Sequence, residues 1–153
     1  MLVALAIAAM LLVAVEAAFK ASAENYQQNE DIFKAVNSAR QALFRITTQL
    51  RTANAVDPNN ALSNECSMIT AAGEDITYRY NSSDKKLYLI TNDDLSDSDY
   101  VLCDNVTAMN CTKTSVVEDS VVKVQKVQIS ITVASDNVEK TISAAAAIRR
   151  NLN

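Results

Sequence analysis

Residues 1–19 read MLVALAIAAMLLVAVEAAF, and this stretch decides how the rest of the chain must be arranged. The stretch has no polar side chain before Glu16, which is also its only charge. A helix on the surface of a soluble protein carries a polar face, and this stretch has none. The pattern therefore predicts a helix surrounded on every side by apolar material, either lipid or other apolar helices.

Two other interpretations of residues 1–19 stay open at this stage. A secretory signal peptide begins with basic residues and ends at a cleavage site before a loop, whereas here no basic residue precedes the apolar run and a helical pattern follows it. A plain buried core helix would also be apolar all round. The strictly apolar run is shorter than the ~20 residues that span a bilayer, and a longer span has to include Glu16.

The next part of the chain, residues 20–53, has an amphipathic pattern. Its apolar residues recur at alternating intervals of four and three, which predicts one helical stripe of near-heptad period: Ile32, Val36, Ala39, Leu43, Ile46, Leu50 and Ala53. Phe33 and Phe44 are expected to widen this stripe. No Gly or Pro interrupts residues 1–53, so we expect one helix of roughly 80 Å. A domain of ~100 residues has a radius of gyration of only ~13 Å, so part of the helix must protrude.

Beyond the helix the pattern changes to that of strands. The helix should end near Asn54, because loop-forming residues follow and Pro58 disfavours helix at the residue before it. Alternation and turn residues predict strands at 75–80, 86–91, 100–103, 127–133 and 138–146, with hairpins between the first two and the last two. We therefore expect an α+β fold with the helical stripe on an antiparallel sheet. The chain is expected to divide into an apolar helix at residues 1–24 and a globular part at residues 25–153.

The composition argues against several classes of function. The chain has 153 residues and a net charge of −4, and it lacks the basic patch that a nucleic-acid-binding protein would show. It contains no His, the usual general base, and no pair of nucleophile and base can be named, so an enzyme is not expected. Three cysteines without a CxxC pair or a His do not fit the usual ligand set of zinc.

The N-terminal segment MLVALAIAAMLLVAVEAAFKAS (1–22) resembles that of type IV pilins and type II secretion pseudopilins. Further stretches resemble J-type minor pseudopilins and W-type minor pilins: NSARQALFRITTQLRTA (37–53), ITYRY (76–80), NVT (105–107), VQISITV (127–133) and TISAAAAIRRNL (141–152). Together they cover most of the chain. The resemblance implies the pilin fold, in which a long N-terminal helix packs by its C-terminal half on an antiparallel sheet.

The resemblance also implies a structural subunit of a bacterial filament. Such a subunit is processed by a prepilin peptidase, carries a methylated N-terminus and resides in the inner membrane before assembly. It then joins copies of itself and other pilin-like subunits in an extracellular or periplasmic filament. The residues expected in the filament core are Leu2, Val3, Leu5, Ile7, Leu11, Leu12, Val15 and Glu16. The alternative is a single-pass membrane-anchored extracytoplasmic binding domain that does not polymerise.

The sequence departs from the family pattern in two respects. The leader and the glutamate that usually precede M-L-V-A-L are expected before Met1, and Glu16 is not the equivalent of that glutamate. Ala9 and Ala17 stand near the positions where the family often has a helix-breaking Gly or Pro. An unpaired Glu16 is costly in lipid, so it should reach the membrane edge, pair with Lys20 or contact a neighbouring subunit.

We expect one disulfide, because an exported domain meets an oxidising compartment. If residues 103–111 are extended, Cys103 and Cys111 lie ~26 Å apart and cannot bond each other. That favours Cys66 paired with Cys103, with Cys111 as the alternative partner.

Two further features are candidate sites on the surface. The loop at 92–99 carries Asp93, Asp94, Asp97 and Asp99, an oxygen-rich set suited to calcium, although EF-hand spacing is absent and a solvated acidic loop is the plainer interpretation. No other cofactor is expected. The sequences that begin at Asn81, Asn105 and Asn110 match the N-glycosylation pattern, which also arises by chance.

Overall fold

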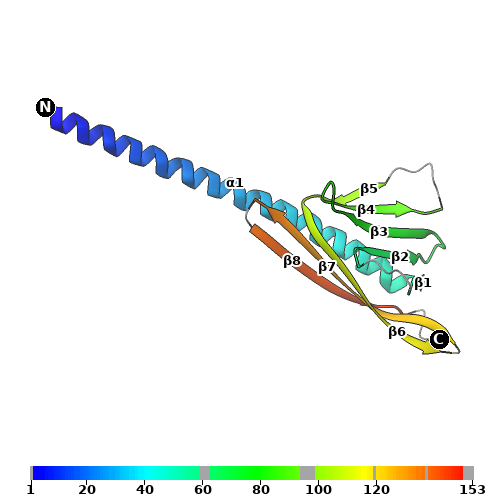
Figure 1. Cartoon of the computed structure of the whole chain (residues 1–153). Coiled ribbons are helices and arrows are strands. Elements are labelled where there is room, and N and C mark those ends of the chain that lie inside the picture. The colour runs from blue at the N-terminus through cyan, green and yellow to red at the C-terminus, as the bar shows by residue number, and fades with distance from the viewer. Residues whose placement is uncertain (1, 59–62, 94–98, 119, 137, 150–153) are drawn as a thin grey trace.

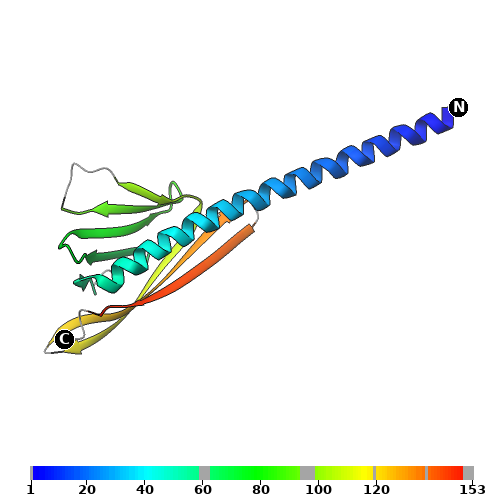
Figure 2. The same ribbon diagram turned by 180° about the vertical axis from the view of Figure 1, so that it is seen from behind.

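The computed structural model describes residues 2–58, 63–93, 99–118, 120–136 and 138–149, and within them one helix and eight strands. The elements are α1 (Leu2–Thr52), β1 (Ala55–Val56), β2 (Glu65–Ile69), β3 (Asp75–Asn81), β4 (Lys86–Thr91), β5 (Tyr100–Cys103), β6 (Val106–Glu118), β7 (Val121–Ser135) and β8 (Val138–Ala147). The N-terminal half of α1 projects away from all the strands (Figures 1 and 2).

Helix α1 is a single helix of 51 residues, which corresponds to a length of roughly 75 Å. It ends at Thr52 because the chain turns there to pair with β2. The Asn54 backbone N–H donates to the Ile69 carbonyl oxygen (2.9 Å), and the Asn54 side-chain amide donates to the Thr70 carbonyl oxygen (2.9 Å). The predicted end near Asn54 is confirmed.

The first sheet is an antiparallel meander of five strands in the order β1-β2-β3-β4-β5. The hairpin between β3 and β4 closes through side-chain turns: the Asn81 Oδ1 accepts from the Ser83 N–H (3.1 Å), and the Asp84 Oδ1 accepts from the Lys86 N–H (3.3 Å). Asn and Asp are frequent in turns because their side chains bond the backbone two residues ahead. The predicted strands at 75–80, 86–91 and 100–103 are confirmed.

The second sheet has three antiparallel strands in the order β6-β7-β8. In the β7–β8 hairpin Ile131 pairs with Ile142 and Ser135 with Val138, and Asp136 in the connecting turn has a φ of 50°. The predicted strands at 127–133 and 138–146 are confirmed, the former as part of a longer strand. Strands β1, β2 and β6 are not predicted by the sequence pattern, and neither is the division of the strands into two sheets.

The core lies between the two sheets and the C-terminal half of α1. This half contacts β7 and β8 of the second sheet and β5 of the first. Ala39, Ile46, Leu50 and Ala53 are fully buried, Leu43 is nearly so, and Ile32 and Val36 are half-buried. The predicted stripe and the α+β fold class are therefore confirmed.

The expectation that Phe33 and Phe44 widen the buried stripe is wrong. Their side chains are 64% and 74% exposed. Each stands two positions before a buried residue, Ala35 or Ile46, and two positions correspond to about 200° around a helix. Both rings consequently lie outside the buried face of α1, with Phe33 beside β8.

Tyr78 of β3 connects the first sheet to α1. Its side chain is fully buried, and its hydroxyl donates to the Gln49 Oε1 of the helix. Burial raises the pKa of Tyr78 to about 12, against the smaller opposing effect of the Arg45 charge. The folded protein thus holds the neutral phenol at pH values where an unfolded chain would ionise it.

We expect this pKa difference to appear as a loss of stability at high pH. The contribution of Tyr78 is complete below pH 10 and is lost as the pH rises to about 12, because the unfolded state releases its proton first. A difference of about two pH units corresponds to roughly 2–3 kcal/mol. Denaturant unfolding of the full chain in detergent between pH 9 and 12 measures the loss. Tyr78→Phe should flatten the profile and Tyr26→Phe, at an exposed position, should not; equal profiles for all three proteins would contradict the assignment.

Candidate functional site

The part of α1 that precedes the globular core is the most unusual surface of the molecule. Every side chain from Val3 to Asp31 is exposed, and the first helix residue with a partly buried side chain is Ile32. At 1.5 Å per residue the protruding part is roughly 45 Å long. Figures 1 and 2 show it as one uninterrupted rod that extends beyond both sheets.

Residues 1–19 are called the apolar segment below, and the described part of this segment forms the outer end of the rod. Its described large apolar side chains are between 55% and 78% exposed: Val3, Leu5, Ile7, Met10, Leu11, Leu12, Val13, Val15 and Phe19. The predicted filament-core residues Val3, Leu5, Ile7, Leu11, Leu12, Val15 and Glu16 are thus all free of contacts with the strands, and the side chain of Leu2 lies outside the described residues. None of the residues that the structure describes covers this surface.

The apolar segment has the length and composition of a membrane anchor. Among the described residues, α1 is the helix long and apolar enough to cross a membrane, and none of its most apolar window is buried. Residues 2–19 span roughly 27 Å as a helix, close to the ~30 Å of a bilayer's hydrocarbon core. Such a segment is compatible with membrane anchoring.

Exposed aromatic rings continue along α1 beyond the apolar segment. Phe19, Tyr26, Phe33 and Phe44 are between 64% and 78% exposed. They recur at intervals of about two, two and three helical turns, so they share one face of the helix. This face, the aromatic stripe, lies outside the stripe that α1 buries against the sheets. The aromatic stripe is not predicted by the sequence analysis, although its spacing is visible in the sequence.

A groove lies where α1 meets β8, at the base of the protruding rod. It has a volume of about 460 Å³ and is lined on its apolar side by Ile32, Phe33, Val36 and Ile142. Phe33 belongs to both the groove and the aromatic stripe. The aromatic stripe of the rod therefore reaches apolar surface on the globular part.

Charges on the protruding rod begin at Glu16 and increase toward the core. Farther along the rod, the Lys34 ammonium forms an ion pair with Glu30 one turn away (2.7 Å), and the hydrogen bond to Glu30 raises the pKa of Lys34. Glu16 and Lys20, both described, form no such pair, so the predicted pairing is not seen in the isolated chain. The carboxylate of Glu16 faces the surroundings at the edge of the apolar segment.

The acidic loop falls largely outside the described residues, since Asp94 and Asp97 are not among them. Of the other two carboxylates, Asp93 accepts a hydrogen bond from the Asp75 backbone N–H (3.0 Å), and Asp99 lines a pocket on the first sheet. In the part of the chain that the structure covers, no cluster of three or more potential metal ligands occurs. The calcium prediction therefore stays a prediction.

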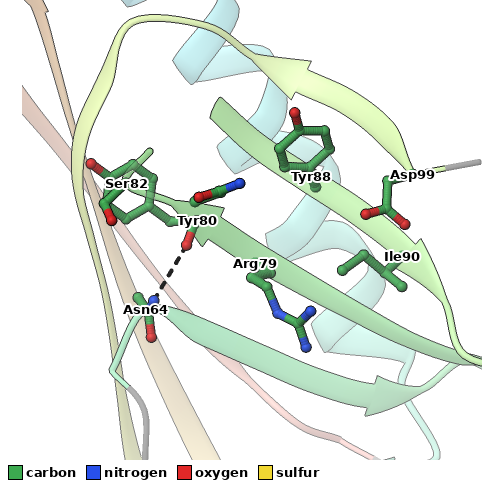
Figure 3. A pocket seen from close by; sticks show the side chains of 8 residues that line it. Asn64, Arg79, Tyr80, Ser82, Tyr88, Ile90 and Asp99 are labelled. Atoms are coloured by element: carbon green, nitrogen blue, oxygen red, sulfur yellow. Dashed lines mark hydrogen bonds between the residues drawn. The ribbon is translucent and has the colours of Figure 1, made fainter. Parts of the chain in front are cut away.

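The pocket beside Asp99 is polar and lies on the first sheet (Figure 3). Its volume is about 620 Å³, and Arg79, Tyr88 and Ile90 line it together with Asp99. Arg79 is ion-paired with Glu65, and the Tyr88 hydroxyl donates to Asp84, which raises the pKa of Tyr88. The Arg79 guanidinium and the Tyr88 hydroxyl, which line this pocket, thus already have partners in the first sheet and its hairpin.

The three Asn residues of the glycosylation pattern differ in their surroundings. The Asn81 side chain accepts hydrogen bonds from the Ser83 backbone and hydroxyl in the β3–β4 turn through its amide oxygen. Asn105 is exposed with a φ of 58°, and Asn110 is exposed on β6. Modification of these residues stays a prediction.

The structure brings Cys66 together with Cys111, the alternative partner, rather than with Cys103. All three thiols are free and buried, and the Cys66 and Cys111 thiols lie close enough for each to affect the pKa of the other. The Cys103 thiol instead donates to the Asp104 carbonyl oxygen (3.3 Å). The sequence distance excludes only a bond between Cys103 and Cys111, whereas the partner of Cys66 depends on which strands meet.

Comparisons with models of known protein families and with curated proteins found no match.

Proposed function

We propose that this chain is a structural subunit of a bacterial type IV pilus-like or type II secretion pseudopilus filament. Its apolar segment holds it in the inner membrane before assembly and packs in the centre of the filament afterwards. Its partners are copies of itself and other pilin-like subunits, and the globular part faces the outside. The observation that carries this proposal is that α1 stays exposed from Val3 to Asp31 although its outer end is apolar.

The free energy of burial gives the first argument. Covering a large apolar side chain stabilises by roughly 1.5–3 kcal/mol, and the apolar segment carries many such side chains on all its faces. Only lipid or other apolar helices can surround a helix on every side. Helices of successive subunits can do this in a fibre, where a head-to-tail contact that does not close propagates indefinitely.

The aromatic stripe gives the second argument, and it favours a filament over a simple anchor. A membrane anchor needs only ~20 residues, which the apolar segment nearly supplies. Phe44 lies roughly 37 Å farther along α1 than Phe19, too far for lipid around the anchor to cover it. Neighbouring subunits can cover Phe33 and Phe44, because helices that pack side by side meet along their lengths.

The absence of a break in α1 gives the third argument. The apolar segment and the stripe that is buried in the core belong to one helix. The position and orientation of the apolar segment therefore fix those of the globular part. A flexible tether would suit an independent binding domain, whereas a rigid connection suits a subunit whose orientation must repeat along a fibre.

The alternative function is a membrane-anchored binding domain that does not polymerise. The polar pocket beside Arg79 and Asp99 favours it, because an exposed pocket on the sheet could hold a polar partner (Figure 3). This function leaves the aromatic stripe without a role, so it accounts for fewer of the observations.

Electron microscopy of cells that make the chain, with a gold-labelled antibody against the globular part, separates the two functions. We expect gold along filaments if the chain is a subunit. Gold confined to the cell envelope in every cell, together with monomeric chain after extraction in mild detergent, would contradict the filament proposal and leave the anchored domain as the better account.

A further inference from the structure

The two sheets are joined where β2 and β6 meet. The Cys111 backbone N–H in β6 donates to the carbonyl oxygen of Ser63, which lies just before β2 (2.7 Å). Close by, the Tyr80 hydroxyl of β3 donates to the Thr107 carbonyl oxygen of β6 (2.9 Å). These two hydrogen bonds tie the start of β2 and the end of β3 to β6, so side chains that face inward at this junction are held at a fixed separation.

Two thiols face each other at this junction. Cys66 of β2 is 0% exposed and Cys111 of β6 is 9% exposed. The two thiols lie close enough for each to affect the pKa of the other, and the strands that carry them are in contact. Ser63, which holds the Cys111 backbone, stands three residues before Cys66, so the backbone contact and the thiol contact belong to one junction.

Cys103 cannot reach Cys66 without a rearrangement of the first sheet. Cys66 lies in β2 and Cys103 in β5, and the strand order places β3 and β4 between them. Three strand spacings correspond to roughly 14 Å, whereas the Cα atoms of a disulfide are at most about 7 Å apart. Of the two partners that the sequence analysis left open for Cys66, the geometry therefore selects Cys111.

The surroundings make Cys111 the reactive member of the pair. The interaction with the Cys66 thiol lowers the pKa of Cys111, and the nearby charge of Lys113 acts in the same direction against the effect of burial. The Lys113 ammonium is held in place by the Asp57 carbonyl oxygen (2.6 Å). The interaction with the Cys111 thiol, together with burial, raises the pKa of Cys66. Burial also raises the pKa of Cys103, to about 11, so that thiol stays protonated.

We propose that Cys66 and Cys111 form a disulfide that joins the first sheet to the second, and that Cys103 stays a free thiol. The oxidant is the disulfide of a thiol–disulfide oxidoreductase or of oxidised glutathione. The Cys111 thiolate attacks one sulfur of that disulfide and releases the other as a thiolate. Cys66 then loses its proton and attacks the Cys111 sulfur, which releases the second donor thiolate. Two thiols of the chain are oxidised, one donor disulfide is reduced, and the donor takes up the protons.

Oxidation in the cell requires that the globular part be outside the cytoplasm, and in this respect the inference rests on the proposed function. The bond would close a loop that contains β3, β4 and β5 and so restrict the unfolded chain. We expect reduction to lower the melting temperature of the full chain in detergent by roughly 10 °C or more. A Cys66→Ser, Cys111→Ser double variant should show no such response to reductant, while Cys103→Ser should respond like the unaltered chain.

The pairing is tested directly on the purified full chain in detergent, first reduced and then treated with oxidised glutathione. Trypsin leaves Cys103 and Cys111 in one peptide, so the chain is cleaved before Asp104, which separates them. Non-reducing mass mapping should show the Cys66 and Cys111 peptides linked and one alkylatable thiol, at Cys103. Three alkylatable thiols, or a link to the Cys103 peptide, would overturn the inference. The Cys103→Ser variant is the control: it should still link Cys66 to Cys111, because Cys103 takes no part in forming the bond.

A second measurement keeps the inference separate from the proposed function. The oxidation of purified protein requires neither export nor filaments, so its failure counts against the pairing alone. Alkylation of intact cells before lysis reports the state that the cell produces. A linked pair in cells supports both the pairing and the outward position of the globular part. Free thiols in cells, beside a pair that links readily after purification, would count against that outward position.

Discussion

Replacing Ala8 with aspartate should abolish filaments while the globular part stays folded. Ala8 lies in the middle of the apolar segment and its side chain is exposed in the isolated chain. A carboxylate at the centre of an apolar helix costs roughly 2.5–3.5 kcal/mol on insertion into a bilayer, and every subunit of a filament would carry that cost. Electron microscopy of cells in which the variant is the only copy measures the effect.

The stability of the globular part should not change in this variant, because Ala8 lies roughly 35 Å along the helix from Ile32, where contact with the sheets begins. Circular dichroism and thermal melting of the full chain in detergent check this. Two controls match the change: Ala8→Leu keeps the site apolar, and Gln28→Asp places the same charge on the polar part of the rod. Both should form filaments. If Ala8→Asp still assembles, or if residues 25–153 alone form filaments, the apolar segment is only an anchor.

The sequence predicts the helix and the β7–β8 hairpin well because their patterns are local. Ile46 and Leu50 lie four residues apart on one helical face, and Ile129 and Ile131 lie two apart on one face of a strand. Each pattern repeats often enough within its own element to be recognised without knowledge of its partners. The fold class follows from these elements together with the apolar segment.

Strands β2 and β6 escape prediction because their inward residues do not form an apolar pattern. β2 turns only Cys66 and Met68 fully inward, and the inner face of β6 includes Met109, Cys111 and the half-buried Lys113. A strand of this kind forms because its neighbours offer a ladder of hydrogen-bonding groups, which is a property of the whole sheet. The division into two sheets, and with it the meeting of Cys66 and Cys111, depends on the same long-range pairing.

The candidate assembly surface is predicted in part. The apolar segment is evident from composition, whereas the aromatic stripe was hidden by the assumption that Phe33 and Phe44 belong to the core. Large apolar residues are usually buried, so a Phe on an amphipathic helix is naturally assigned to the inner face. Only the register of the helix against the sheets shows that both rings lie outside the buried face.

A pair of substitutions on the same helix should separate the two faces of α1. Leu50 is fully buried and Phe44 is 74% exposed, and they lie within two turns of each other. Leu50→Ala removes a side chain from the core and leaves a cavity, which costs about 2–5 kcal/mol of unfolding free energy. That is a large share of the 5–15 kcal/mol typical of a domain. Denaturant unfolding of the full chain in detergent measures it.

Phe44→Ala should change the unfolding free energy by no more than about 0.5 kcal/mol, because its ring has little to lose in the isolated chain. The effect of Phe44→Ala should appear instead in assembly, as fewer or shorter filaments. The aromatic stripe then lacks one of the two rings, Phe33 and Phe44, that lie beyond the reach of lipid. Thr48→Ala, one turn away at another exposed position, is the control that should affect neither measurement. Equal losses of stability for Leu50→Ala and Phe44→Ala would contradict the register of α1 against the sheets. Unchanged filaments with Phe44→Ala would show that the aromatic stripe is not a contact between subunits, and the rod would then hold the filament together through the apolar segment alone.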